Sequence, residues 1–199
     1  MTLGLACADQ NGIHLVMETA AILDGPPRTI HDARHVMGNE MGKIIPLQSD
    51  PSIILLAGGS LDHWRRFVGS WRPNQVSLTL RQVKEIVLRF LNTEATQDHR
   101  VFGRVCGYEG TDPVCYAVDR EKGDKVASER RIRLDQETAA VGVYATAAVE
   151  KVVQKLAHAR NAGLVIREVL DEFIEYDSAL GDDKRELLGP VHAMTIQKP

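Results

Sequence analysis

The chain has 199 residues, a length that fits one domain with a substantial buried core. Hydrophobic residues make up 44% of it, and no apolar run approaches the roughly 18 residues that a membrane-spanning helix needs. The formal net charge of −3 argues against general nucleic-acid binding, which needs a basic surface. The N-terminus lacks the basic segment and apolar stretch of a secretory signal, so the expected compartment is the cytoplasm.

The three cysteines, Cys7, Cys106 and Cys115, lack the spacing of a metal site and suit small buried residues in a reducing compartment. Cys106 and Cys115 are placed to face each other across a predicted hairpin. A disulfide between them is the less favoured interpretation, because the expected compartment is reducing.

The first eighteen residues are expected to form a β-hairpin. Leu3–Ala8 and Ile13–Met17 have the composition of strands, and Gln10-Asn11-Gly12 is typical of a tight turn. Thr2 follows Met1 directly. If Met1 is removed, one residue carries both a hydroxyl and a free amine, and the amine can act as base for the hydroxyl in attack on a carbonyl. The sequence therefore places a candidate nucleophile at the end of a sheet.

The connection between Glu18 and Lys43 contains Asp24-Gly25-Pro26-Pro27, which indicates a turn, and it is expected to form a flap or to contact a neighbouring subunit. Within it His31 and His35 stand four residues apart, a spacing at which helical histidines can share a metal. No third ligand accompanies them, so surface or interface histidines are favoured and no metal is expected.

Hydrophobic periodicity predicts the remaining elements. Period-two patterns predict strands, and three-to-four-residue spacing predicts amphipathic helices. The expected strands are Lys43–Leu47, Ile53–Ala57, Val101–Tyr108, Val114–Asp119, Val126–Leu134 at a sheet edge, Ala139–Val143 and Val191–Ile196. The expected helices are one through Leu61, Trp64 and Val68, one from Leu80 to near Asn92, Ala147–Ala157 and Leu164–Tyr176. Such segregated runs predict an α+β fold with stacked strand runs and helices outside.

Four segments in this order resemble the β-type subunits of bacterial proteasomes, including the peptidase of the two-component ATP-dependent protease and the proteobacterial proteasome homologues. They are Thr2 with Asn11-Gly12-Ile13 and Glu18, then Gly42–Leu47, then Leu56–Asp62, and finally Asp177-Ser178-Ala179-Leu180-Gly181. The resemblance runs over almost the whole chain. It implies a single domain over residues 1–199 with the four-layer αββα sandwich of N-terminal-nucleophile hydrolases.

The same resemblance implies a catalytic set. Thr2 would supply nucleophile and base, and the charge of Lys43 would lower the proton affinity of the Thr2 amine and hydroxyl. Glu18, at a position where the family usually has Asp, would hold Lys43 charged and oriented. Asp177 would complete the polar network around the N-terminus.

The oxyanion donor implied by the resemblance is the backbone N–H of Gly58, although an ungapped count from Lys43 would put Leu55 in that place. Two hydroxyls of the family pattern are missing. Its Gly-Ser-Gly is here Gly142-Val143-Tyr144, and the second serine of its Asp-Ser-Ala-Ser-Gly motif is Leu180. Their loss predicts slow or narrow activity.

The leading hypothesis is a threonine peptidase that cleaves unfolded polypeptides inside a self-assembled chamber, a homo-oligomeric double ring, without a cofactor. Folded substrates would require a separate ATP-dependent unfoldase, because the chain lacks a phosphate-binding Gly-rich loop with its lysine. Two alternatives stay open: a small-molecule amidohydrolase with the same nucleophile, and a structural ring subunit that has lost catalysis. For Lys43 and Glu18 taken by themselves, the alternative to a catalytic role is an ordinary surface ion pair.

Overall fold

The computed structural model describes residues 2–18, 43–71, 77–93, 100–180, 187 and 191–199. Met1 and the connection that carries His31 and His35 lie outside the described residues, so the predictions made for them stay untested. No helix in the described part of the chain is long and apolar enough to cross a membrane.

The first sheet contains the two ends of the chain. Its order is β8 (Ala139–Gly142), β1 (Leu3–Asp9), β2 (Gly12–Glu18) and β9 (Val191–Gln197), with antiparallel pairing throughout. β1 and β2 are the predicted hairpin, with Gln10 and Asn11 as its two-residue loop.

Gly12 begins β2 and is not a central residue of the hairpin turn, which differs from the sequence-based expectation. Its φ is 146°, and a Cβ there would lie 2.2 Å from the Ile196 carbonyl oxygen on β9. Glycine is therefore needed because the neighbouring backbone approaches so closely.

The second sheet is a meander of five antiparallel strands. In order they are β3 (Ile44–Ser49), β4 (Ser52–Gly59), β5 (Val101–Glu109), β6 (Asp112–Arg120) and β7 (Ser128–Arg133). β7 is the predicted edge strand. Cys106 and Cys115 pair across β5 and β6, and both are free, buried thiols.

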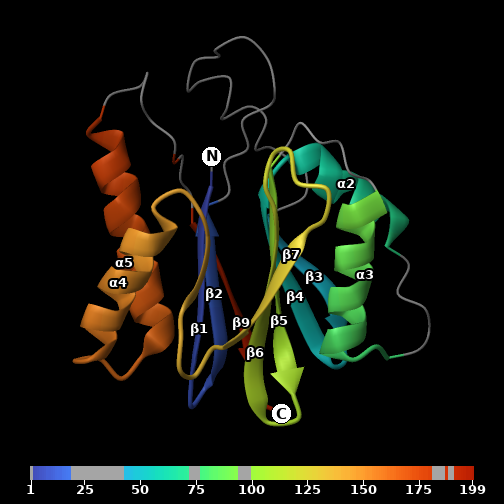
Figure 1. Cartoon of the computed structure of the whole chain (residues 1–199). Helices are drawn as coiled ribbons and strands as arrows, with labels where there is room; N and C mark the ends of the chain where they lie inside the picture. The colour runs from blue at the N-terminus through green and yellow to red at the C-terminus, as the bar shows by residue number, and fades with distance from the viewer. Residues whose placement is uncertain (1, 19–42, 72–76, 94–99, 181–186, 188–190) are drawn as a thin grey trace.

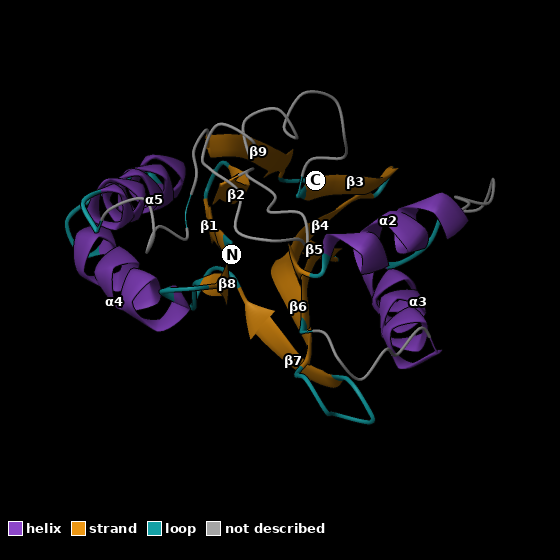
Figure 2. Cartoon of the chain, turned by 90° about the horizontal axis from the view of Figure 1, so that it is seen from above, coloured by secondary structure: helices purple, strands orange, loops and turns teal. Residues whose placement is uncertain are grey.

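Two helix pairs enclose the sheets. α4 (Ala145–Leu156) and α5 (Ala162–Ser178) lie on the outer face of the first sheet, whereas α2 (Leu61–Ser70) and α3 (Leu80–Thr93) lie on the outer face of the second (Figure 1). The view from above shows the two sheets facing each other between these pairs (Figure 2). The prediction of an α+β, four-layer αββα sandwich is confirmed.

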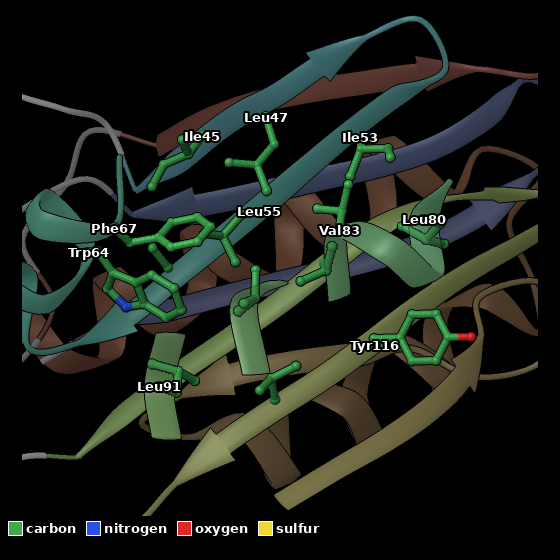
Figure 3. Packing of buried hydrophobic residues seen from close by; sticks show 14 of the residues in the cluster. Ile45, Leu47, Ile53, Leu55, Trp64, Phe67, Leu80, Val83, Leu91 and Tyr116 are labelled. Carbon is green, nitrogen blue, oxygen red and sulfur yellow. The ribbon is translucent and has the colours of Figure 1, made fainter. Parts of the chain in front are cut away.

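Strand alternation explains why the apolar strands are buried on both faces. On β4, Leu55 and Ala57 pack with the α2 and α3 side chains, whereas Ile54 and Leu56 face the first sheet. Figure 3 shows Leu55 beside Phe67 of α2 in the outer cluster. The sandwich therefore has three apolar layers, one between the sheets and one under each helix pair.

Candidate active site

Thr2 lies immediately before β1 and is buried, with 6% of its surface exposed. The next residue, Leu3, pairs with Gly142 of β8. The Thr2 carbonyl accepts a hydrogen bond from the Val143 N–H at 2.8 Å, which continues the β1–β8 ladder by one step. Thr2 is thus held at the sheet end that the sequence predicted.

Lys43 joins two of the predicted site residues. Its Nζ donates to Thr2 Oγ1 at 2.6 Å and to Glu18 Oε1 at 2.6 Å. Lys43 directly precedes β3, and its carbonyl accepts the Ala57 N–H at 2.8 Å, so its backbone is anchored to β4. Glu18 is the last residue of β2. Ends of both sheets therefore supply the Thr2–Lys43–Glu18 cluster.

This cluster is buried. Lys43 is 6% exposed and Glu18 0% exposed, so the alternative of an ordinary surface ion pair is wrong. Burial lowers the pKa of the Lys43 ammonium, and the attraction and hydrogen bond of Glu18 only partly oppose that shift. A cation that donates to the Thr2 hydroxyl favours loss of the hydroxyl proton. The arrangement therefore suits activation of Thr2 as a nucleophile.

Asp177 is bonded to a residue close to Thr2 in the chain of contacts. It lies in the last turn of α5, fully buried. Its Oδ1 accepts the Tyr144 phenol O–H at 2.9 Å, and its Oδ2 accepts the Leu187 N–H at 2.6 Å. One link from Asp177 toward Thr2 runs through Tyr144 and the neighbouring Val143. Its predicted catalytic role stays a prediction.

Gly58 lies against the first sheet, close to the strand that borders Thr2. A Cβ on Gly58 would stand 3.0 Å from Val141 Cγ2 on β8. Its carbonyl accepts the Trp64 Nε1–H at 2.9 Å. Leu55, the other position considered, packs under α2 and α3. The role of Gly58 as oxyanion donor stays a prediction.

Tyr144 is the residue near this site that sequence reasoning left without a role. It was noted only as part of Gly142-Val143-Tyr144, where the resemblance implies a missing serine. Its phenol brings a hydroxyl to the Asp177 carboxylate. The available signal was its place shortly before the helix predicted over Ala147–Ala157, but the left-handed backbone that directs its side chain has no sequence signature in a tyrosine.

The described residues contain no group of three or more His, Cys, Asp or Glu side chains that could hold a metal ion.

Comparisons with known proteins find the same fold. No family model matches the chain, and the search of curated proteins found no match. The solved structure of Anbu (ancestral beta-subunit) from Yersinia bercovieri aligns with a TM-score of 0.60 and 11% identity, over 97% of this chain and 80% of that one. The Anbu (Gly-1) mutant from Hyphomicrobium sp. strain MC1 aligns with a TM-score of 0.56 and 12% identity, over 100% of this chain and 82% of that one.

These neighbours correct the family assignment drawn from the sequence. Identification with the bacterial proteasome β subunits is wrong, because the structural neighbours are Anbu proteins, which are proteasome-like but distinct. The physical reason lies in the residues that carried the resemblance. Strand ends and a turn glycine are requirements of the shared fold, so they do not distinguish its branches. At 11–12% identity the likeness shows a proteasome-like, N-terminal-nucleophile-type fold alone.

Proposed function

We propose that this chain is a single-domain threonine-type peptidase whose nucleophile is Thr2 after removal of Met1. The observation that carries the proposal is the position of Lys43 Nζ, which lies 2.6 Å from both Thr2 Oγ1 and Glu18 Oε1 within a buried cluster. A nucleophile hydrogen-bonded to a group that tunes it, with a third group orienting that second one, is the arrangement that covalent catalysis requires.

The chemistry follows from these three side chains. Thr2 Oγ1 attacks the carbonyl carbon of the scissile amide while the hydroxyl proton passes to the Thr2 amine. The tetrahedral intermediate collapses, the C–N bond breaks, and the proton moves to the departing nitrogen. Water then hydrolyses the ester on Thr2 with the same amine as base, which restores the hydroxyl. Lys43 stabilises the developing negative charge on Oγ1, and Glu18 keeps the ammonium in place.

The remaining members of the site complete the proposal. Gly58 supplies the N–H for the oxyanion, a role that rests on the sequence resemblance alone. Asp177 supports the surroundings of Thr2 through Tyr144. Because Val143 and Leu180 bring no hydroxyl, proton transfer has fewer relays and the expected turnover is slow.

The proposed substrates are unfolded polypeptides that enter a homo-oligomeric double ring in the cytoplasm, with a separate ATP-dependent unfoldase for folded substrates. Support comes from the fold shared with Anbu (ancestral beta-subunit) and from apolar side chains exposed on α4 and α5, namely Val153, Leu164 and Tyr176. Enclosure of the active sites in a chamber protects folded proteins outside it from unselective hydrolysis. Mass photometry at micromolar concentration tests the assembly, and a monodisperse monomer contradicts the chamber.

The experiment that tests the nucleophile is intact mass spectrometry after incubation with a peptide epoxyketone. The protein is produced as a fusion whose cleavage leaves Thr2 as the first residue. We expect one adduct on the cleaved protein and none on the uncleaved fusion, because the epoxyketone needs both the hydroxyl and the free amine. A cleaved, folded protein without an adduct would contradict the proposal.

A structural subunit without catalysis is the second candidate, because Val143 and Leu180 stand where the resemblance implies hydroxyls. This candidate predicts assembly together with no labelling.

A small-molecule amidohydrolase predicts labelling by small electrophiles and hydrolysis of acyl amides in preference to unfolded protein, which substrate profiling separates from a peptidase.

A further inference from the structure

Tyr144 has a backbone conformation that a side chain disfavours. Its φ is 57°, and among the described residues it is the one non-glycine residue with φ in the left-handed region. The conformation crowds Cβ against the backbone, so neighbouring contacts must maintain it. Tyr144 directly precedes α4, where its backbone carbonyl accepts the Ala148 N–H at 2.8 Å.

The side chain of Tyr144 is held at its hydroxyl and on its ring. The phenol donates to Asp177 Oδ1 at 2.9 Å, and the ring stacks on Phe173 with centroids 5.5 Å apart and planes 20° apart. Tyr176 meets it edge-on at 6.1 Å. These three partners all lie on α5. The contacts therefore fasten the start of α4 to the last turns of α5.

The two residues before Tyr144 lie against the nucleophile. Val143 donates its N–H to the Thr2 carbonyl at 2.8 Å. Gly142 has φ 102°, and a Cβ there would lie 1.7 Å from the Thr2 carbonyl oxygen. Residues 142–144 are thus clamped between Thr2 on one side and α5 on the other.

We infer that Tyr144 and Asp177 are positioning residues for Thr2: the buried carboxylate holds the phenol, the phenol holds the left-handed turn, and the turn presents the Val143 amide to the Thr2 carbonyl. The orientation of Thr2 Oγ1 relative to Lys43 Nζ then depends on a contact on the outer side of the first sheet. An effect of Tyr144 on the reactivity of Thr2 rests on the proposed function, whereas its effect on the Val143–Thr2 hydrogen bond does not.

A purely local role is the competing explanation, in which Tyr144 only begins α4. Tyr144→Gly separates the two roles. Glycine adopts positive φ freely, so a residue needed only for the backbone turn is replaced without harm. Tyr144→Phe removes the phenol oxygen alone and keeps the ring stack. Tyr176→Phe is the matched control, because Tyr176 meets the same ring and is 58% exposed.

The mechanical test is site-resolved amide hydrogen exchange of Val143, with the Leu5 amide as an internal reference in the middle of β1. We expect Val143 to exchange about 10-fold faster in Tyr144→Phe and in Tyr144→Gly, with Leu5 unchanged, because local opening exposes single hydrogen bonds without global unfolding. Unchanged Val143 protection in both variants would overturn the inference.

The catalytic test is the rate of epoxyketone labelling of the protein with a free Thr2 amine. A loss of about 10- to 100-fold in both variants, with Tyr176→Phe near the parent rate, supports positioning, because small misplacements of a reacting group have effects of this size. A parent rate in Tyr144→Gly would overturn it. If the parent protein itself does not label, the proposed function fails, and the exchange experiment still decides whether Tyr144 positions Thr2.

Discussion

Replacement of Lys43 by Met tests the centre of the proposed mechanism. Methionine nearly matches the length and apolar stem of lysine and lacks its charge and donors. The change removes both 2.6 Å hydrogen bonds, one to Thr2 Oγ1 and one to Glu18 Oε1. We expect two separate losses, one in stability and one in reactivity.

The stability loss follows from the burial of Glu18, which is 0% exposed. Removing one member of a buried ion pair costs about 3–5 kcal/mol in the free energy of unfolding, because the remaining charge stays buried. For a chain of this length each kcal/mol shifts the melting temperature by roughly 2–4 °C, so a fall of about 6–20 °C is expected. The double variant Lys43→Met with Glu18→Leu should recover much of it, since an apolar pair avoids the desolvation of both charges.

The fall in labelling rate is expected to be larger than the loss of folded protein alone would cause. Without the ammonium, the Thr2 hydroxyl loses the group that favours its ionisation, and epoxyketone labelling should fall by about 100-fold or more. The double variant should regain stability but not labelling. This divergence separates a catalytic lysine from a structural one.

The pH dependence gives the two properties opposite signs. The pKa of Lys43 is lowered from 10.5 by burial, so between the lowered value and 10.5 the unfolded chain binds more protons than the folded one. The contribution of Lys43 to stability therefore rises with pH across that window, whereas reactivity that needs the ammonium falls. The difference between wild type and Lys43→Met isolates both trends from other titrations.

Lys84→Met is the matched control. Lys84 is also largely buried and donates to Glu85 and Glu129, but it lies on α3, outside the Thr2–Lys43–Glu18 cluster. Urea unfolding and labelling rates are measured for both variants. If Lys43→Met unfolds within 1 kcal/mol of wild type and labels within about threefold of it, the assignment of Lys43 is refuted.

Three further outcomes are expected. Thr2→Ala should abolish labelling and peptide hydrolysis while assembly, measured by mass photometry, is unchanged; hydrolysis at the parent rate would exclude Thr2. Gly142→Ala should lower the free energy of unfolding by about 2 kcal/mol or more, because φ is 102° and the new methyl meets the Thr2 carbonyl; a neutral result in urea unfolding would contradict this packing. Partial burial alone would raise the pKa of Glu109, but hydrogen bonds from Arg81, Tyr116 and Arg131 lower that pKa to about 2. The contribution of the Glu109 carboxylate to stability is therefore fully present above pH 4.5 and is lost as the pH falls toward 2. Between pH 4.5 and 2 the free energy of unfolding of Glu109→Gln should therefore fall by roughly 2–3 kcal/mol less than that of wild type.

Periodicity was sufficient to predict the elements because nearly every strand and helix has an apolar face that one layer of the sandwich buries. The helix predicted from Leu80 to Asn92 is α3, Leu80–Thr93, and the strand predicted over Val101–Tyr108 is β5, Val101–Glu109. Each shows the spacing that its layer requires.

Hydrophobic periodicity could not predict which distant segments pair with each other. The contact between the Val143 amide and the Thr2 carbonyl joins residues far apart in the sequence, and so does the approach of Ile196 to Gly12. Single-sequence patterns contain no register for such pairs. The role predicted for Asp177 stays a prediction, and its tyrosine partner could be identified only from the backbone conformation of Tyr144 and its contact with α5.

The buried position of Lys43 also bears on why these residues are present at all. A buried lysine and glutamate contribute little net stability, because apolar side chains of similar volume stabilise a core as well or better. Burial here lowers the pKa of the lysine, which means that the folded state disfavours the charge that it holds. Stability alone therefore gives no reason for this cluster to occupy the meeting point of two sheets. The proposed mechanism gives one: Lys43 Nζ lies 2.6 Å from Thr2 Oγ1, where its positive charge would stabilise the negative charge that develops on that oxygen.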